Sequence, residues 1–155
     1  MTPEPPATPV RVELLECNLD DMTGEALGYA LERLLEAGAL EAWFTPIYMK
    51  KNRPAVLLSA LCRPEDADDL AALLLRETST LGVRRRAVER TIAERQMVQV
   101  QTRWGPVRCK VKLLDGAPVS IKPEHDDCAR IARSQGLPLD SVVNEARTLA
   151  EAQLR

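Results

Sequence analysis

The sequence predicts an α+β fold, in which a ferredoxin-like βαββαβ unit precedes a small β-hairpin region and two C-terminal helices. Strand-like and helix-like apolar patterns alternate in the order β-α-β-β-α-β between residues 10 and 92. Short alternating segments and an Asp-Gly turn then precede two helical segments in residues 93–155. We therefore expect a disordered Pro-rich leader over residues 1–9, a ferredoxin-like domain, and a C-terminal appendage that packs with it as one unit.

Apolar periodicity locates the elements of the first domain. The expected strands cover residues 10–17, 40–49, 55–62 and 83–92. The first helix is expected over residues 25–37, with Gly38 as its C-cap, and the second begins at Pro64. The buried positions expected on these helices are Leu27, Leu31, Leu34, Leu35, Leu70, Leu73 and Leu74. Each helix would cover one face of an antiparallel sheet, which leaves the other face open to a ligand or a second subunit.

The appendage is predicted to contain three strands and two helices. The strands are expected over residues 96–102, 107–113 and 119–121, with a hairpin turn at Asp115-Gly116. The third helix is expected to start at Pro123 and end at Gly136, and the fourth to run from Pro138 to the end of the chain.

Composition excludes several classes of protein. The net charge of −2 gives no case for nucleic-acid binding, and no apolar run reaches the roughly 20 residues of a membrane span. Residues 1–9 lack the basic and apolar segments of a signal peptide, so we expect a cytoplasmic protein. The four cysteines form no CxxC pair, which argues against a zinc ribbon and favours free thiols. Buried packing is the preferred interpretation for Cys17, Cys62 and Cys109.

The segment after the first strand contains a pair of adjacent carboxylates. Asn18, Asp20 and Asp21 are expected on the turn that leads into the first helix. Adjacent carboxylates raise each other's proton affinity, and a hard divalent cation with oxygen ligands stabilises them together. Asp and Thr are also preferred at helix N-termini, where they accept backbone N–H groups and meet the helix dipole. The residues therefore fit either a metal site or a helix cap.

Two other segments are candidates for binding phosphate. Lys50, Lys51 and Arg53 share one turn, where three cations either bind phosphate oxygens or are simply solvated. The second segment combines hydroxyl residues with arginines: Thr78, Ser79, Thr80, Gly82, Arg84, Arg85 and Arg86. It lacks the spacing of a Walker loop, and the sequence does not show that the two segments adjoin.

The start of the third helix contains the only histidine of the chain. Glu124, His125 and Asp126 could ligate a metal, but acidic residues are common in a first helical turn and a lone histidine is more often solvated. No Ser-His-Asp or Cys-His arrangement is indicated, because there is one histidine and no nucleophile-elbow pattern.

Five segments together resemble the C-terminal part of the LarC family, the nickel insertion proteins of nickel-pincer nucleotide biosynthesis. These segments are Asn18–Glu25, Leu34–Leu40, Thr45–Pro54, Glu77–Arg84 and Lys122–Cys128. The match spans most of residues 11–146 without gaps. This chain departs from the family at His125, where an aromatic residue is usual, and it lacks the family's histidine-rich N-terminal part.

The resemblance implies a nickel chelatase that acts in making the cofactor of lactate racemase. Nickel would enter a pyridinium bisthiocarboxylate mononucleotide, with manganese or magnesium required and CTP hydrolysed to CMP and pyrophosphate. On physical grounds we assign the divalent ion to Asp20, Asp21 and Glu124. The triphosphate is assigned to the basic and hydroxyl residues Lys50, Lys51, Arg53, Thr78, Thr80 and Arg84. The expected partners are the N-terminal part of the same family protein and further copies of this chain. The alternative to a nickel chelatase is a non-catalytic, oligomeric nucleotide-binding module with a regulatory or scaffolding role.

Overall fold

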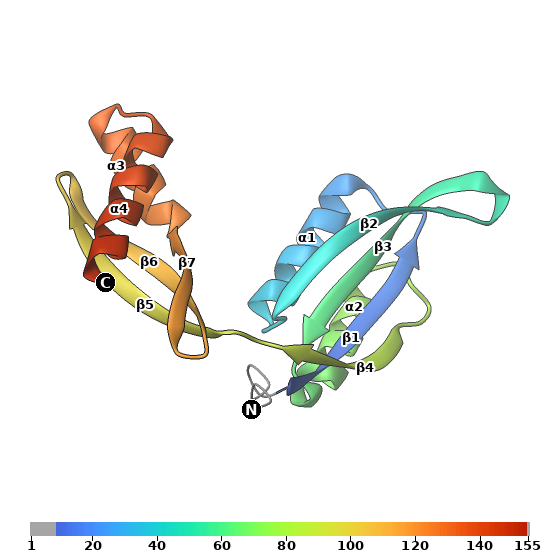
Figure 1. Cartoon of the computed structure of the whole chain (residues 1–155). Helices are drawn as coiled ribbons and strands as arrows, with labels where there is room; N and C mark the ends of the chain where they lie inside the picture. The colour runs from blue at the N-terminus through green and yellow to red at the C-terminus, as the bar shows by residue number, and fades with distance from the viewer. Residues whose placement is uncertain (1–8, 155) are drawn as a thin grey trace. The chain divides into compact units, whose positions relative to one another are not determined.

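A computed structural model describes residues 9–154, which divide into two compact units, residues 9–90 and 91–154 (Figure 1). The first unit contains β1 (Pro9–Leu19), α1 (Gly24–Glu36), β2 (Glu41–Met49), β3 (Arg53–Cys62), α2 (Ala67–Glu77) and β4 (Arg84–Thr91), with short 3-10 helices at Lys50–Asn52 and Pro64–Asp66. The second unit contains β5 (Glu94–Thr102), β6 (Gly105–Leu114), β7 (Ala117–Pro123), α3 (His125–Gln135) and α4 (Leu139–Gln153). The predicted leader lies outside the described residues, apart from Pro9. That the appendage packs as one unit with the domain stays a prediction.

The strands of the first unit form one sheet in the order β2-β3-β1-β4. β3 pairs antiparallel with β2 on one side and β1 on the other, so it is an interior strand of the sheet. β2 is an edge strand, which accommodates Pro46 because an edge position does not require its missing N–H. The predicted α+β class is confirmed, and the element order is the predicted β-α-β-β-α-β.

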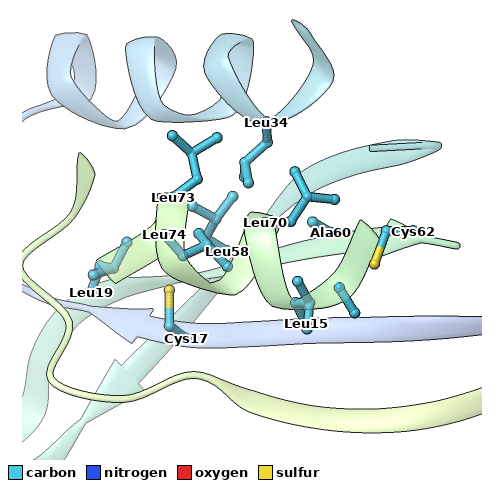
Figure 2. Packing of buried hydrophobic residues seen from close by; sticks show 11 residues of the cluster. Leu15, Cys17, Leu19, Leu34, Leu58, Ala60, Cys62, Leu70, Leu73 and Leu74 are labelled. Atoms are coloured by element: carbon cyan, nitrogen blue, oxygen red, sulfur yellow. The ribbon is translucent and has the colours of Figure 1, made fainter. Parts of the chain in front are cut away.

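The core of the first unit lies between one face of this sheet and the two helices (Figure 2). Leu15, Cys17 and Leu19 project from alternate positions of β1 toward Leu34 of α1 and the leucines of α2. The α2 residues are those the sequence predicted: Leu70, Leu73 and Leu74. Leu35, predicted on the buried stripe of α1, is instead 45% exposed.

The end of α1 explains the role of Gly38. The helix ends at Glu36, and its C-cap is Ala37 rather than the predicted Gly38, which follows with φ 101°, a left-handed conformation that glycine accepts without steric cost. The amide of Ala39 donates to the carbonyl of Leu34, and that of Gly38 donates to the carbonyl of Leu35. This is a Schellman motif, which satisfies carbonyls left free at the helix end.

The second unit is a three-stranded antiparallel sheet, β5-β6-β7, with α3 and α4 packed on one face. Asp115 and Gly116 both have positive φ, so they form the predicted two-residue turn between β6 and β7. Pro123 ends β7 rather than starting a helix, and α3 begins at His125. Within residues 9–154 no helix is long and apolar enough to cross a membrane.

All four cysteines are buried free thiols, which confirms the buried packing predicted for Cys17, Cys62 and Cys109. Cys17 and Cys62 lie in the core of the first unit, and Cys109 and Cys128 lie in that of the second. Burial raises the pKa of each thiol, that of Cys109 to about 11, so the protonated form dominates at neutral pH.

Candidate functional site

The segment between β1 and α1 resolves the choice between a helix cap and another role for the aspartates. Thr23 is the N-cap of α1, and its hydroxyl accepts the amide of Ala26 at 3.2 Å. Asp20 and Asp21 lie on the bend before it and make no capping hydrogen bond in the described structure. Asn18, predicted on the same turn, is instead the penultimate residue of β1. The two carboxylates are therefore available for other contacts.

Asp20 contacts the basic turn between β2 and β3. Its Oδ2 lies 3.2 Å from Nη1 of Arg53, the first residue of β3. The Asp20 side chain is 19% exposed, whereas Arg53 is 55% exposed. Because Arg53 uses one carboxylate oxygen, the second oxygen of Asp20 remains for another ligand.

Asp21 contacts the hydroxyl segment between α2 and β4, where the Ser79 hydroxyl donates to its Oδ1. The neighbouring threonines build the loop itself. Thr78 donates to the carbonyl of Leu74 at 2.6 Å, and Thr80 donates to the carbonyl of Gly82 at 2.8 Å. Thr78 and Thr80, predicted as nucleotide ligands, thus already have backbone partners, while Ser79 between them faces the aspartate.

The three consecutive arginines after this loop point in different directions. Arg84 donates to the side-chain oxygen of Asn18 at 2.7 Å, which places its guanidinium beside the end of β1. Arg85 instead contacts Glu13 and Asp68, and Arg86 lies 3.8 Å from Glu16. Of the three, only Arg84 lies at the end of the sheet where the aspartates lie.

The two loops that the sequence could not connect therefore meet around the aspartate pair within one unit. The contributing side chains are Asn18, Asp20, Asp21, Arg53, Ser79 and Arg84. Sequence analysis placed Ser79 in the phosphate-binding segment but not among the assigned ligands. No local signal distinguished Ser79 from its neighbours, because residues 78–80 all carry hydroxyl groups.

The remaining predicted residues lie elsewhere or project from this site. Lys50 and Lys51 are exposed at the tip of the β2–β3 connection, where Lys51 has φ 63°. Glu124 belongs to the second unit, where its Oε1 lies 3.1 Å from Nζ of Lys110. Over residues 9–154 no group of three or more His, Cys, Asp or Glu side chains is placed to hold a metal.

Two adjacent carboxylates are a donor set that a magnesium or manganese ion can use when other ligands complete its shell. Mg²⁺ is commonly bound through one or two carboxylates, with waters and substrate phosphates completing its shell. Asp20 and Asp21 supply two carboxylates whose orientation is fixed by Arg53 and Ser79. The guanidinium groups of Arg53 and Arg84 add two positive charges at the same end of the sheet.

Comparison with known proteins identifies the family. A protein-family model described as "Nickel insertion protein" matches residues 3–143 of the chain. The chain belongs to this family. A curated relative from Pelobacter propionicus is 51% identical over 132 residues, which cover 85% of this chain and 34% of the relative. The pyridinium-3,5-bisthiocarboxylic acid mononucleotide nickel insertion protein of Thermotoga petrophila is 39% identical over 141 residues, covering 90% and 36%.

Solved structures agree with membership of the nickel insertion family. One is LarC2, described as the C-terminal domain of a cyclometallase involved in the synthesis of the NPN cofactor of lactate racemase. It is 42% identical, with a TM-score of 0.88 over 93% of this chain and 99% of that chain. Protein MK0293 from Methanopyrus kandleri is 29% identical, with a TM-score of 0.62 over 88% and 84%. The predicted resemblance to the C-terminal part of the LarC family is thereby confirmed, and the chain spans about a third of the length of the curated relatives it matches.

Proposed function

We propose that this chain is the CTP-binding and divalent-metal-binding part of a nickel insertase. The reaction would place nickel in pyridinium-3,5-bisthiocarboxylic acid mononucleotide, the compound in the name of the Thermotoga relative, with hydrolysis of CTP to CMP and pyrophosphate. The observation that carries this proposal is the aspartate pair held between Arg53 and Ser79, from two loops with phosphate-binding character.

Each side chain has a distinct part in this proposal. Asp20 and Asp21 would hold Mn²⁺ or Mg²⁺, which supplies charge to neutralise the triphosphate. Arg53 and Arg84 would bind phosphate oxygens directly, since the guanidinium plane matches two of these oxygens at once. Asn18 keeps Arg84 in place through the 2.7 Å hydrogen bond. Positioning and charge stabilisation of this kind are the main protein contributions to reactions at phosphorus.

The lysines at the β2–β3 tip would meet the outer end of the phosphate chain. Neither Lys50 nor Lys51 forms an ion pair with a described residue, so both ammonium groups are available to an anion. A long, flexible side chain is suited to this contact, because it acts as a mobile point charge. The N-terminal part of the family protein and other copies of this chain remain expected partners.

Calorimetric titration of the chain with CTP, in the presence and absence of Mn²⁺, tests the proposal. Asp20→Asn should weaken Mn²⁺-dependent CTP binding by about 10- to 100-fold, because the amide keeps the contact with Arg53 but removes a charged cation ligand. Asp69→Asn, an exposed position on α2, is the matched control and should leave the affinity unchanged. Unchanged affinity in Asp20→Asn would contradict the metal assignment. An assay of pyrophosphate release then distinguishes an enzyme that hydrolyses CTP from a non-catalytic nucleotide-binding module.

A further inference from the structure

The exposed face of the β5-β6-β7 sheet has an unusual concentration of positive charge. Five cations occupy its strand positions: Arg95, Arg108, Lys110, Lys112 and Lys122. They alternate with residues such as Val107, Cys109 and Val111, whose side chains face the helices and are buried. The strand positions of this face contain no carboxylate.

The register places cations directly opposite cations. Arg95 pairs with Lys112 across β5 and β6, and Lys110 pairs with Lys122 across β6 and β7. Like charges directly opposite on one sheet face are destabilising. Two such pairs in a small sheet therefore raise the energy of the free protein, and a bound anion would lower it.

Neighbouring carboxylates neutralise only part of this charge. Asp127 contacts Arg108, and Glu124 contacts Lys110. Arg95, Lys112 and Lys122 form no ion pair with any residue in the range 9–154. Each cross-strand pair thus retains at least one ammonium or guanidinium group that is free to bind an anion.

The two cation pairs are close enough for their long side chains to reach two anionic groups on one rigid ring. Lys110 and Lys112 are two residues apart on β6, about 6.7 Å along the strand, and the pairs are also offset by one strand, so their centres lie about 8 Å apart. Met97 on β5 lies opposite Lys110, two residues from Arg95, and is 49% exposed, which offers a polarizable apolar surface beside the two pairs. A ring with anionic substituents at two non-adjacent positions would contact both cation pairs while it packs on the thioether.

We infer that this face binds the pyridinium ring of the substrate, with one thiocarboxylate at each cation pair. The inference rests on the proposed function, because the ring and its 3,5-thiocarboxylates are those of the mononucleotide in the Thermotoga relative's name. The contacts are charge-assisted hydrogen bonds from Arg95 and Lys112 to one group and from Lys110 and Lys122 to the other.

The test is an NMR titration of the ¹⁵N-labelled full chain with pyridine-3,5-dicarboxylate, which has carboxylates in place of the thiocarboxylates. Amide shifts should concentrate in residues 95–97, 110–112 and 120–122. Pyridine-3-carboxylate, with one anionic group, should bind about fivefold more weakly or worse, because it meets one cation pair only. Binding should weaken with added salt.

Charge-removing variants locate the site. Lys112→Gln and Lys122→Gln should each weaken dicarboxylate binding about two- to fivefold, the range for a solvent-exposed ion pair. Arg147→Gln removes an exposed cation from α4 and should have no effect. The inference would be overturned if the two pyridines bound with equal affinity, or if Arg147→Gln weakened dicarboxylate binding as much as the sheet variants do. It would also be overturned if millimolar dicarboxylate caused no localised amide shifts.

A second titration separates this inference from the proposed function. Lys112→Gln should bind CTP and Mn²⁺ as the wild type does, and Asp20→Asn should bind the dicarboxylate as the wild type does. A wild-type chain that binds the dicarboxylate but not CTP with Mn²⁺ would contradict only the proposed function. A wild-type chain that binds CTP with Mn²⁺ but not the dicarboxylate would contradict only the role of the basic sheet face.

Discussion

Substitutions in the loop between α2 and β4 should separate hydroxyls that build the loop from the hydroxyl that orients a carboxylate. Thr78→Val keeps the shape of the side chain but removes its 2.6 Å bond to the Leu74 carbonyl and its 3.3 Å bond from the Thr80 amide. A net contribution of about 0.5–1.5 kcal/mol for each of the two bonds predicts a loss of about 1–3 kcal/mol in the free energy of unfolding.

Ser79→Ala should show the opposite pattern. Ser79 is exposed and bonds only Asp21 in the described structure, so its removal should change the free energy of unfolding by less than about 0.5 kcal/mol. Without that hydroxyl Asp21 is free to rotate, and Mn²⁺-dependent CTP affinity should fall about tenfold, the lower end for loss of a group that orients a metal ligand.

Urea denaturation followed by tryptophan fluorescence measures the stability of the first unit. Trp43 lies in residues 9–90 and Trp104 lies in residues 91–154, so a Trp104→Phe background makes the signal specific for the first unit. Calorimetry with CTP and Mn²⁺ measures affinity in the same variants. The reasoning is refuted if Ser79→Ala costs as much stability as Thr78→Val, or if Ser79→Ala binds CTP and Mn²⁺ normally.

Two further predictions concern the β2–β3 tip and the start of α3. Lys51→Gly should weaken CTP binding about two- to fivefold. The free energy of unfolding should stay unchanged within about 0.5 kcal/mol, because glycine readily accepts the left-handed φ of 63° at this position. A CTP affinity equal to that of the wild type would contradict the assignment of Lys51. Hydrogen bonds from Arg108 hold the pKa of Asp127 below its usual value. Because the pKa is lower in the folded state, the ionised carboxylate stabilises the fold at pH values above the unfolded pKa of about 3.9. This stabilisation is lost as the pH falls through the folded pKa. Asp127→Asn should therefore lower the urea midpoint of the second unit at neutral pH, with the difference shrinking below about pH 4; a pH-independent difference, or an equal one in Asp126→Asn, would contradict the ion-pair explanation.

Local sequence patterns predicted most of the elements because strand and helix periodicity, caps and two-residue turns are properties of neighbouring residues. The Asp115-Gly116 turn and the four strands of the first unit are examples. Boundaries that depend on pairing with a distant strand were less accurate. The strand predicted over residues 107–113 begins earlier, since Gly105 and Pro106 both pair with β5 and belong to β6. Pro123 is in β7 because it pairs with Cys109.

The candidate site was predictable in its residue types but not in its contacts. Asp20 and Asp21 stood out from sequence, yet their partners lie 33 and 58 residues further along the chain. No local pattern gives such pairings. For the three arginines a local rule does apply, because alternation along a strand places Arg85 on the face opposite Arg84.

The position of β1 in the sheet explains why these distant residues meet. β1 lies between β3 and β4, and β3 runs antiparallel to it, so the end of β1 meets the start of β3 at Arg53. The contact of Arg84 with Asn18 shows that β4 also begins where β1 ends. Any residue just past β1 is therefore within reach of both the β2–β3 turn and the loop before β4. The aspartates occupy that position, so the strand order alone brings acidic and basic groups from three loops to one end of the sheet.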